Sequence, residues 1–255
     1  MTVVPSRRPV LEVRDLRKQF VLHHLGGRHV TALDGVDLDV AKGEHVALVG
    51  TSGAGKSSLL RCVWRSYLPS SGSVVLRRTD GTSVDLATLD DTTLADVREH
   101  EIGYVSQFLR REARRTAVEV VRGSARRRGV LDQAAAGDLA VEALGRVALP
   151  AELWNTYPVL LSGGEQQRIN LAAGTVAPPR LLLLDEPVAS LDPANRGAVL
   201  ELIARLRDSG VAVLSVFHDL DAVRQLADRV VRLERGRVVA VGPPEVVLTA
   251  AGVAS

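Results

Sequence analysis

A glycine-rich segment with one lysine and one hydroxyl side chain has the composition of a phosphate-binding loop. It fits the pattern G-x-x-x-x-G-K-[ST] and lies between an expected strand, 44–49, and an expected helix, 57–67. Glycines let backbone N–H groups and a helix N-terminus face an anion closely. Lys56 would neutralise the β- and γ-phosphates and the Ser57 hydroxyl would bind Mg²⁺. The alternative is an ordinary glycine turn, and the pattern arises by chance in about one chain per hundred of this length. The residues expected to contact the nucleotide here are Gly50, Thr51, Ser52, Gly53, Ala54, Gly55, Lys56, Ser57 and Ser58.

Two carboxylates follow a run of four leucines at 181–184. The run predicts a central parallel strand that is covered on both faces, with Asp185 and Glu186 at its carboxyl end. Asp185 is placed to hold Mg²⁺ and Glu186 to polarise an attacking water. The alternative is a strand followed by an acidic helix cap. The phosphate loop upstream favours the catalytic interpretation.

A third motif, Leu161 to Gln167, allows two interpretations. Ser162 and Glu165 have the spacing of a capping box at a helix start. A capping box does not require the paired Gly163 and Gly164 that lie between them. Paired glycines before a helix expose N–H groups to an anion. The segment is therefore also a candidate second phosphate site, facing a γ-phosphate that another subunit holds.

These three motifs, in this order, resemble the ATP-binding-cassette (ABC) family over nearly the whole chain. The Leu-Ser-Gly-Gly-x-Gln sequence is specific to that family. The resemblance implies two cassettes with two ATP molecules between them, each signature motif completing the partner's site, and poor hydrolysis by a monomer. It implies that Lys56, Glu186 and His218 are catalytic. It also implies that Ser162, Gly163, Gly164 and Glu165 contact the partner's ATP.

Further roles are implied by the same resemblance. Gln107 matches a glutamine that senses Mg²⁺ and the partner protein. Ser190, Leu191 and Asp192 match a loop that couples the two ATP sites. Phe20 lies where the family usually stacks a tyrosine on adenine, and phenylalanine can also stack. The expected Mg²⁺ ligands are Ser57, Gln107 and Asp185.

Strands that alternate with helices predict an α/β fold with a mostly parallel sheet. Short strands at 10–13 and 36–40, with a turn between them, predict an N-terminal antiparallel β subdomain. An Ala- and Arg-rich stretch predicts an inserted α-helical subdomain over about 108–174, which would divide the core into 1–107 and 175–255. Asp192 and Pro193 are expected to start a helix, and 229–241 to form a hairpin that turns at Gly236.

Composition limits the partners. The chain has 255 residues and a net charge of +2, too small to predict a nucleic-acid surface. The single cysteine, Cys62, is expected to be a buried, inert thiol in a cytoplasmic protein. We find no signal peptide and no run near the roughly 20 apolar residues of a membrane span. Any work at a membrane would therefore proceed by docking.

Several segments resemble one ABC branch, PhnL, the cassette protein of the bacterial phosphonate carbon–phosphorus lyase system. They are 20–24, 66–69, 105–110 and 217–219. The resemblance implies partners among the lyase core subunits and a link to phosphonate-ribosyl triphosphate synthesis. The alternatives are the nucleotide-binding subunit of an ABC membrane transporter, and an ATP-dependent clamp without turnover. The basic residues between Arg110 and Arg115 fit an acidic partner surface or a solvated helix face. The triplet 126–128 is interpreted as solvated.

Overall fold

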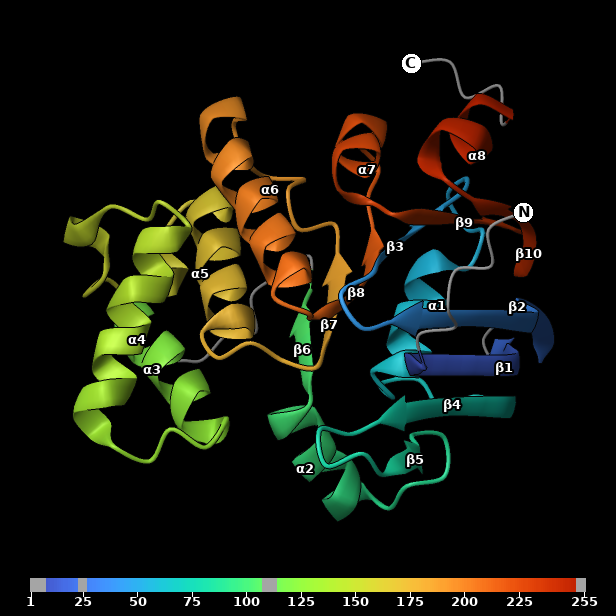
Figure 1. The fold of residues 1–255 in the computed structure, drawn as a ribbon, viewed down its shortest axis with the longest axis horizontal. Helices are drawn as coiled ribbons and strands as arrows, with labels where there is room; N and C mark the ends of the chain where they lie inside the picture. Colours follow the sequence, from blue (N-terminus) through green and yellow to red (C-terminus); the bar gives the residue numbers. More distant parts are fainter. Residues whose placement is uncertain (1–7, 23–26, 107–113, 251–255) are drawn as a thin grey trace.

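The structure is a computed structural model that describes residues 8–22, 27–106 and 114–250. Gln107 and the basic residues Arg110 and Arg111 lie outside the described residues. Two sheets and the helices around them make up the described part, as Figure 1 shows. Within it, no helix is long and apolar enough to cross a membrane.

A six-stranded sheet forms the centre of the molecule, and every neighbouring pair is parallel except β9 and β10. Leu181 and Leu183 pack into one hydrophobic core, and Leu182 and Leu184 into the other. The strand is therefore apolar on both faces, as expected for a covered parallel sheet. In sheet order the strands are β10 (Arg237–Gly242), β9 (Arg229–Glu234), β3 (His45–Val49), β8 (Ala212–Val216), β7 (Leu181–Asp185) and β6 (Ile102–Val105).

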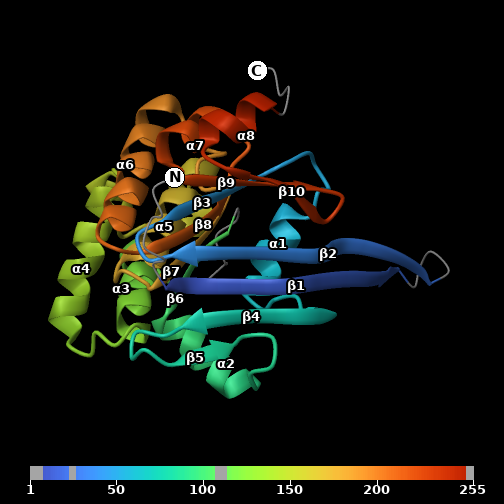
Figure 2. The same cartoon turned by 45° about the vertical axis from the view of Figure 1, so that its right-hand side comes forward.

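A four-stranded antiparallel sheet packs against one side of this layer. Its order is β2 (Arg28–Ala41), β1 (Pro9–Leu22), β4 (Ser71–Arg77) and β5 (Ser83–Asp85). Strands β1 and β2 pair from Pro9 opposite Ala41 to Leu22 opposite Arg28, so they are much longer than expected. Their hairpin extends beyond the rest of the molecule in Figure 2.

Buried residues of α1 and α2 belong to the hydrophobic core that includes the smaller sheet, and those of α3 to α8 belong to the other core. Helices α3, α4 and α5 pack on one another, and α5 lies against β6 at the edge of the large sheet (Figure 1). The α-helices are α1 (Lys56–Val63), α2 (Asp91–His100), α3 (Ala117–Arg127), α4 (Gln133–Arg146), α5 (Gly163–Thr175), α6 (Pro193–Asp208), α7 (Leu220–Leu226) and α8 (Pro244–Ala250). Two short 3₁₀ helices, η2 (Ala151–Leu153) and η3 (Pro158–Leu160), precede α5.

Local chemistry explains where the elements agree with or depart from expectation. Asp192 caps α6 by accepting from the N–H of Asn195 at 3.0 Å, and the terminal hairpin turns at Gly236, whose φ is 79°. Helix α1 ends at Val63 rather than at residue 67, because Arg65 has a left-handed φ of 65°. Cys62 is buried, as expected, and burial raises the pKa of its thiol to about 11.

Candidate functional site

The phosphate loop runs from the end of β3 into α1. Gly55 is the N-cap of α1 with φ 108°, and a Cβ there would lie 2.5 Å from the carbonyl oxygen of Ala32. Only glycine fits this backbone and this space. In the described chain no side chain caps α1, and its first turn carries no acidic residue. The N–H groups at this helix start are therefore open to an anion.

Lys56 lies back against its own loop. Its Nζ donates to the carbonyl oxygens of Gly50 at 2.6 Å and Thr51 at 2.9 Å. Burial lowers the pKa of Lys56, while the nearby carboxylates Glu186 and Asp185 oppose that shift. In this structure the ammonium group is therefore engaged by carbonyl oxygens of its own loop.

Asp185 ends β7 next to the first turn of α1. The Ser57 hydroxyl donates to Asp185 Oδ1 at 3.2 Å, and Asp185 is only 5% exposed. Burial raises the pKa of Asp185, which the Ser57 hydrogen bond and Arg61 partly offset. A carboxylate and a hydroxyl are the hard oxygen ligands that suit Mg²⁺. These two residues therefore fit the cation and would bind it together with phosphate oxygens.

Glu186 and His218 meet at the ends of the neighbouring strands β7 and β8. The distance from His218 Nε2 to Glu186 Oε1 is 2.8 Å. Glu186 has a left-handed φ of 55°, and its N–H donates to the carbonyl oxygen of Val216 at 3.0 Å. The side chain of Glu186 is 18% exposed and that of His218 is 61% exposed. A largely desolvated carboxylate is thus fixed beside an open, solvent-facing imidazole.

The signature segment, Leu161 to Gln167, begins α5 with a complete capping box. Glu165 Oε2 accepts from the Ser162 N–H at 2.7 Å and from the Ser162 hydroxyl at 2.8 Å, and Glu165 N–H is 3.3 Å from Ser162 Oγ. These hydrogen bonds lower the pKa of Glu165. The capping-box interpretation is therefore correct for the isolated chain. Ser162 and Gly163 are also exposed, so the segment is accessible to a second subunit.

The signature segment touches the expected coupling loop within one chain. A Cβ at Gly164 would lie 2.8 Å from the carbonyl oxygen of Ser190, so the two backbones approach closely. Arg168 of α5 donates to Asn195 Oδ1 at 2.6 Å, and Asn195 is held by Asp192. Contacts between backbones and side chains therefore tie the start of α5 to the start of α6.

Two expected site residues are not part of this arrangement as described. Gln107 lies outside the described residues. Phe20 contacts Tyr67 edge-on, with ring centroids 5.1 Å apart, and Lys18 Nζ lies 4.8 Å from the Phe20 centroid. Stacking of Phe20 on adenine stays a prediction.

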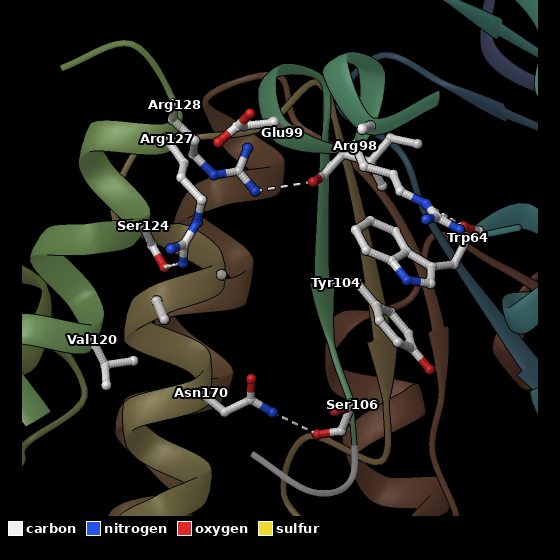
Figure 3. Close-up of a pocket in the computed structure, with 14 residues that line it drawn as sticks. Trp64, Arg98, Glu99, Tyr104, Ser106, Val120, Ser124, Arg127, Arg128 and Asn170 are labelled. Carbon is white, nitrogen blue, oxygen red and sulfur yellow. Dashed lines mark hydrogen bonds between the residues drawn. The ribbon is translucent and has the colours of Figure 1, made fainter. Parts of the chain in front are cut away.

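A pocket of about 390 Å³ that sequence reasoning missed lies between α3, α5, β6 and α2. In Figure 3, Trp64 and Tyr104 form one wall, with ring centroids 5.2 Å apart, and Val120 stands opposite. Arg98 lies over the Trp64 ring at 4.9 Å. The sequence carries little signal for this pocket, because its lining comes from elements far apart along the chain.

The interpretation of the arginine triplet as solvated is wrong for Arg128. Arg126 and Arg127 are exposed, although Arg127 also lines the pocket. Arg128 is half-buried in the pocket, and its Nη2 donates to the carbonyl oxygen of Ile102 at 3.0 Å. Its Nη1 is buried without a hydrogen-bond partner in the described chain. Burial lowers the pKa of Arg128 to about 10. The pocket thus contains a partly desolvated cation with spare donor capacity, and the carboxylate of Glu99 lines the same pocket.

Comparison with known proteins places the chain in a family. Residues 33–189 match the family model described as ABC transporter. The chain belongs to the ABC transporter family. It is 35% identical over 255 residues to a putative peptide import ATP-binding protein of Brucella melitensis, covering 93% of this chain and 72% of that protein. It is 38% identical over 235 residues to the methionine import ATP-binding protein MetN 1 of Rhodococcus jostii, covering 92% and 66%.

Solved structures support the same assignment. A dimeric ABC cassette bound to ADP and phosphate in a post-hydrolysis state superimposes with a TM-score of 0.84 at 28% identity, covering 92% of this chain and 98% of that one. The α/β phosphate-loop fold, ATP binding and ATPase activity of the ABC type are therefore confirmed. The narrower resemblance to PhnL is not supported, since the relatives named above are import ATP-binding proteins.

Proposed function

We propose that this ABC ATPase is the nucleotide-binding subunit of an importer, and that it pairs with a second cassette and docks on a membrane-spanning partner. The relatives described as peptide import and methionine import ATP-binding proteins support the importer role. The observation that carries the ATPase part is the meeting of three groups at neighbouring strand ends. These are the Lys56 loop, the Ser57–Asp185 pair and the Glu186–His218 pair.

The reaction is in-line attack of water on the γ-phosphate of ATP, and the chain contributes position and charge. The N–H groups at the start of α1 receive the phosphates, and Lys56 leaves its loop carbonyls to neutralise them. Mg²⁺, bound by Ser57 and Asp185, would offset phosphate charge. Glu186 orients the water and accepts its proton, and His218 donates toward the γ-phosphate. Ser162 to Gly164 of the second cassette would complete the site and exclude water.

The pocket beside β6 supports docking of a partner segment. It offers the aromatic faces of Trp64 and Tyr104 together with the buried guanidinium of Arg128. An apolar segment that carries a carboxylate or exposed carbonyl groups matches this combination. The contact between Glu186 and His218 favours turnover over a clamp that only binds ATP.

The first experiment measures Mg-ATP hydrolysis by the purified protein and by Glu186→Gln. Loss of the general base should lower the hydrolysis rate by about 10²–10⁴-fold and trap an ATP-bound dimer. Equal turnover in the two proteins would refute the catalytic role of Glu186.

The second experiment identifies the partner by mild solubilisation and copurification. A membrane-spanning protein supports the importer role, and soluble phosphonate lyase subunits would replace it with the narrower phosphonate role. Arg128→Ala should weaken partner retention, while the matched control Arg126→Ala, at an exposed neighbouring position, should not. Equal retention by both variants would remove the pocket from the interface.

A further inference from the structure

Two helix starts are expected to contact the same triphosphate, one from each cassette, and they differ in charge. In the described chain, helix α1 has no side-chain cap and no acid in its first turn. Helix α5 has Ser162 as its cap and Glu165 in its first turn. Both helix N-termini carry partial positive charge. At α5 the carboxylate of Glu165, in the same chain, already interacts with that positive end.

The hydrogen bonds of Glu165 show what it occupies. Its Oε2 accepts from both the N–H and the hydroxyl of Ser162, at 2.7 and 2.8 Å. A serine hydroxyl has one hydrogen to donate, so Ser162 cannot give it to a phosphate while Glu165 holds it. These contacts lower the pKa of Glu165, so it is ionised at neutral pH.

We propose that Glu165 is a positioning residue that opposes ATP-driven pairing, by standing in for the γ-phosphate at Ser162 until the partner's ATP displaces it. This rests on the proposed function, in which Ser162 to Gly164 contact ATP held by the second cassette. Two effects work in the same direction. The phosphate must displace an existing charge-assisted hydrogen bond, and it must approach a like charge. Glu165 therefore raises the ATP concentration at which two cassettes close.

The chain contains a matched control for this role. Helix α3 begins with the same capping box, in which Glu119 Oε2 accepts from the Thr116 N–H at 2.8 Å and is 3.1 Å from the Thr116 hydroxyl. That box lies at a different helix and has no expected contact with ATP. Removing the charge of Glu119 measures only the effect of altering a helix cap. Removing the charge of Glu165 measures that effect together with any effect on phosphate contact.

The test uses the full chain with Glu186→Gln, so that hydrolysis does not interfere. Mg-ATP is titrated, and the dimer fraction is measured by sedimentation for the parent, Glu165→Gln and Glu119→Gln. The glutamine oxygen still accepts from Ser162, so Glu165→Gln keeps the cap and removes only the charge. We expect Glu165→Gln to pair at an ATP concentration about three- to tenfold lower than the parent, and Glu119→Gln to be unchanged. The difference should shrink as salt is raised.

If Glu165 acts only as a structural cap, Glu165→Gln should not lower the ATP concentration needed to form the dimer. In that case Glu165→Gln would need as much ATP as the parent, or more, to form the dimer, and the proposal would be wrong. A parent that fails to pair at any ATP concentration would instead overturn the proposed two-cassette function. The two failures are therefore distinguishable.

Discussion

The starts of α1 and α5, the two helix N-termini that we propose contact phosphate, are capped in different ways. At α1 the N-cap is a glycine with φ 108°, and the nearest charged group, Lys56, is bound to loop carbonyls. At α5 the cap is Ser162, held by the carboxylate of Glu165. The first start is open to an anion and the second is occupied by an internal one. The sequence already indicates this difference, because Ser162 and Glu165 have capping-box spacing and the first turn of α1 has no acid; the structure shows that the carboxylate does accept from Ser162.

The largest effect is expected at the open start. Lys56→Ala removes the only side-chain cation that we place on the phosphates of that cassette, and it should weaken ATP binding by about 10- to 100-fold. Titration with a fluorescent ATP analogue measures this. Lys42→Ala, at an exposed position, is the control and should bind as the parent does. Equal affinity of all three proteins would mean that Lys56 does not leave the loop carbonyls.

Alanine substitutions of the glycines at the two helix starts should differ in their effect on the free energy of unfolding. Gly55→Ala forces a Cβ to 2.5 Å from the Ala32 oxygen at φ 108°, and it should lower the free energy of unfolding by about 2–4 kcal/mol. Gly163→Ala meets no atom of the described chain within 4 Å and should change it by less than about 0.5 kcal/mol. Urea unfolding of the two variants checks this. Similar losses would contradict the contrast between the crowded Gly55 position and the uncrowded Gly163 position.

Substitution of Ser162 tests the start of α5, where Glu165 occupies the cap. Ser162→Ala and Thr116→Ala each remove a capping hydroxyl and should each lower the free energy of unfolding by about 1 kcal/mol. Only Ser162→Ala should also alter ATP-driven dimer formation in the Glu186→Gln background. Parallel unfolding and sedimentation measurements separate the two effects. If Thr116→Ala changed pairing equally, the α5 start would have no special role.

The smallest effect concerns pH. The pKa of Glu165 is lowered in the folded chain, so its carboxylate stabilises the fold above its unfolded pKa, and this is lost as pH falls through the lower folded pKa. The free energy of unfolding of the parent should therefore exceed that of Glu165→Gln by no more than about 0.5 kcal/mol at neutral pH, because the carboxylate is partly exposed to solvent. The gap should close in the acid range. Thermal unfolding from pH 7 to pH 3 would show it, and a gap that widens in acid would contradict the assigned sign.

Local rules explain which features the sequence predicts. Helix caps and tight turns depend on a few neighbouring residues, so Asp192 and Gly236 were correctly predicted. Helix α2 was missed because it buries only Leu94 and Val97, which leaves a weak periodic pattern. The full length of β1 was missed because bulges interrupt its alternation and Asp15 has a left-handed φ of 41°.

The candidate site shows the same division. The motifs identify Lys56, Ser57 and Asp185 by type and spacing, and the fold brings Asp185 to the Ser57 hydroxyl from 128 positions away. Arg128 could not be identified in this way. Its neighbours Arg126 and Arg127 are exposed, and only tertiary packing of α3 beside β6 makes this arginine different. Long-range packing of this kind leaves no local pattern.

The left-handed backbone of Glu186 has a consequence for evolution and engineering. Glycine or asparagine would adopt φ 55° with less strain than glutamate, so either would be expected to give a more heat-resistant chain. A screen that rewards only thermal resistance would therefore tend to discard the carboxylate that we propose orients the attacking water. Thermal resistance and the proposed catalytic role therefore compete at this single backbone position.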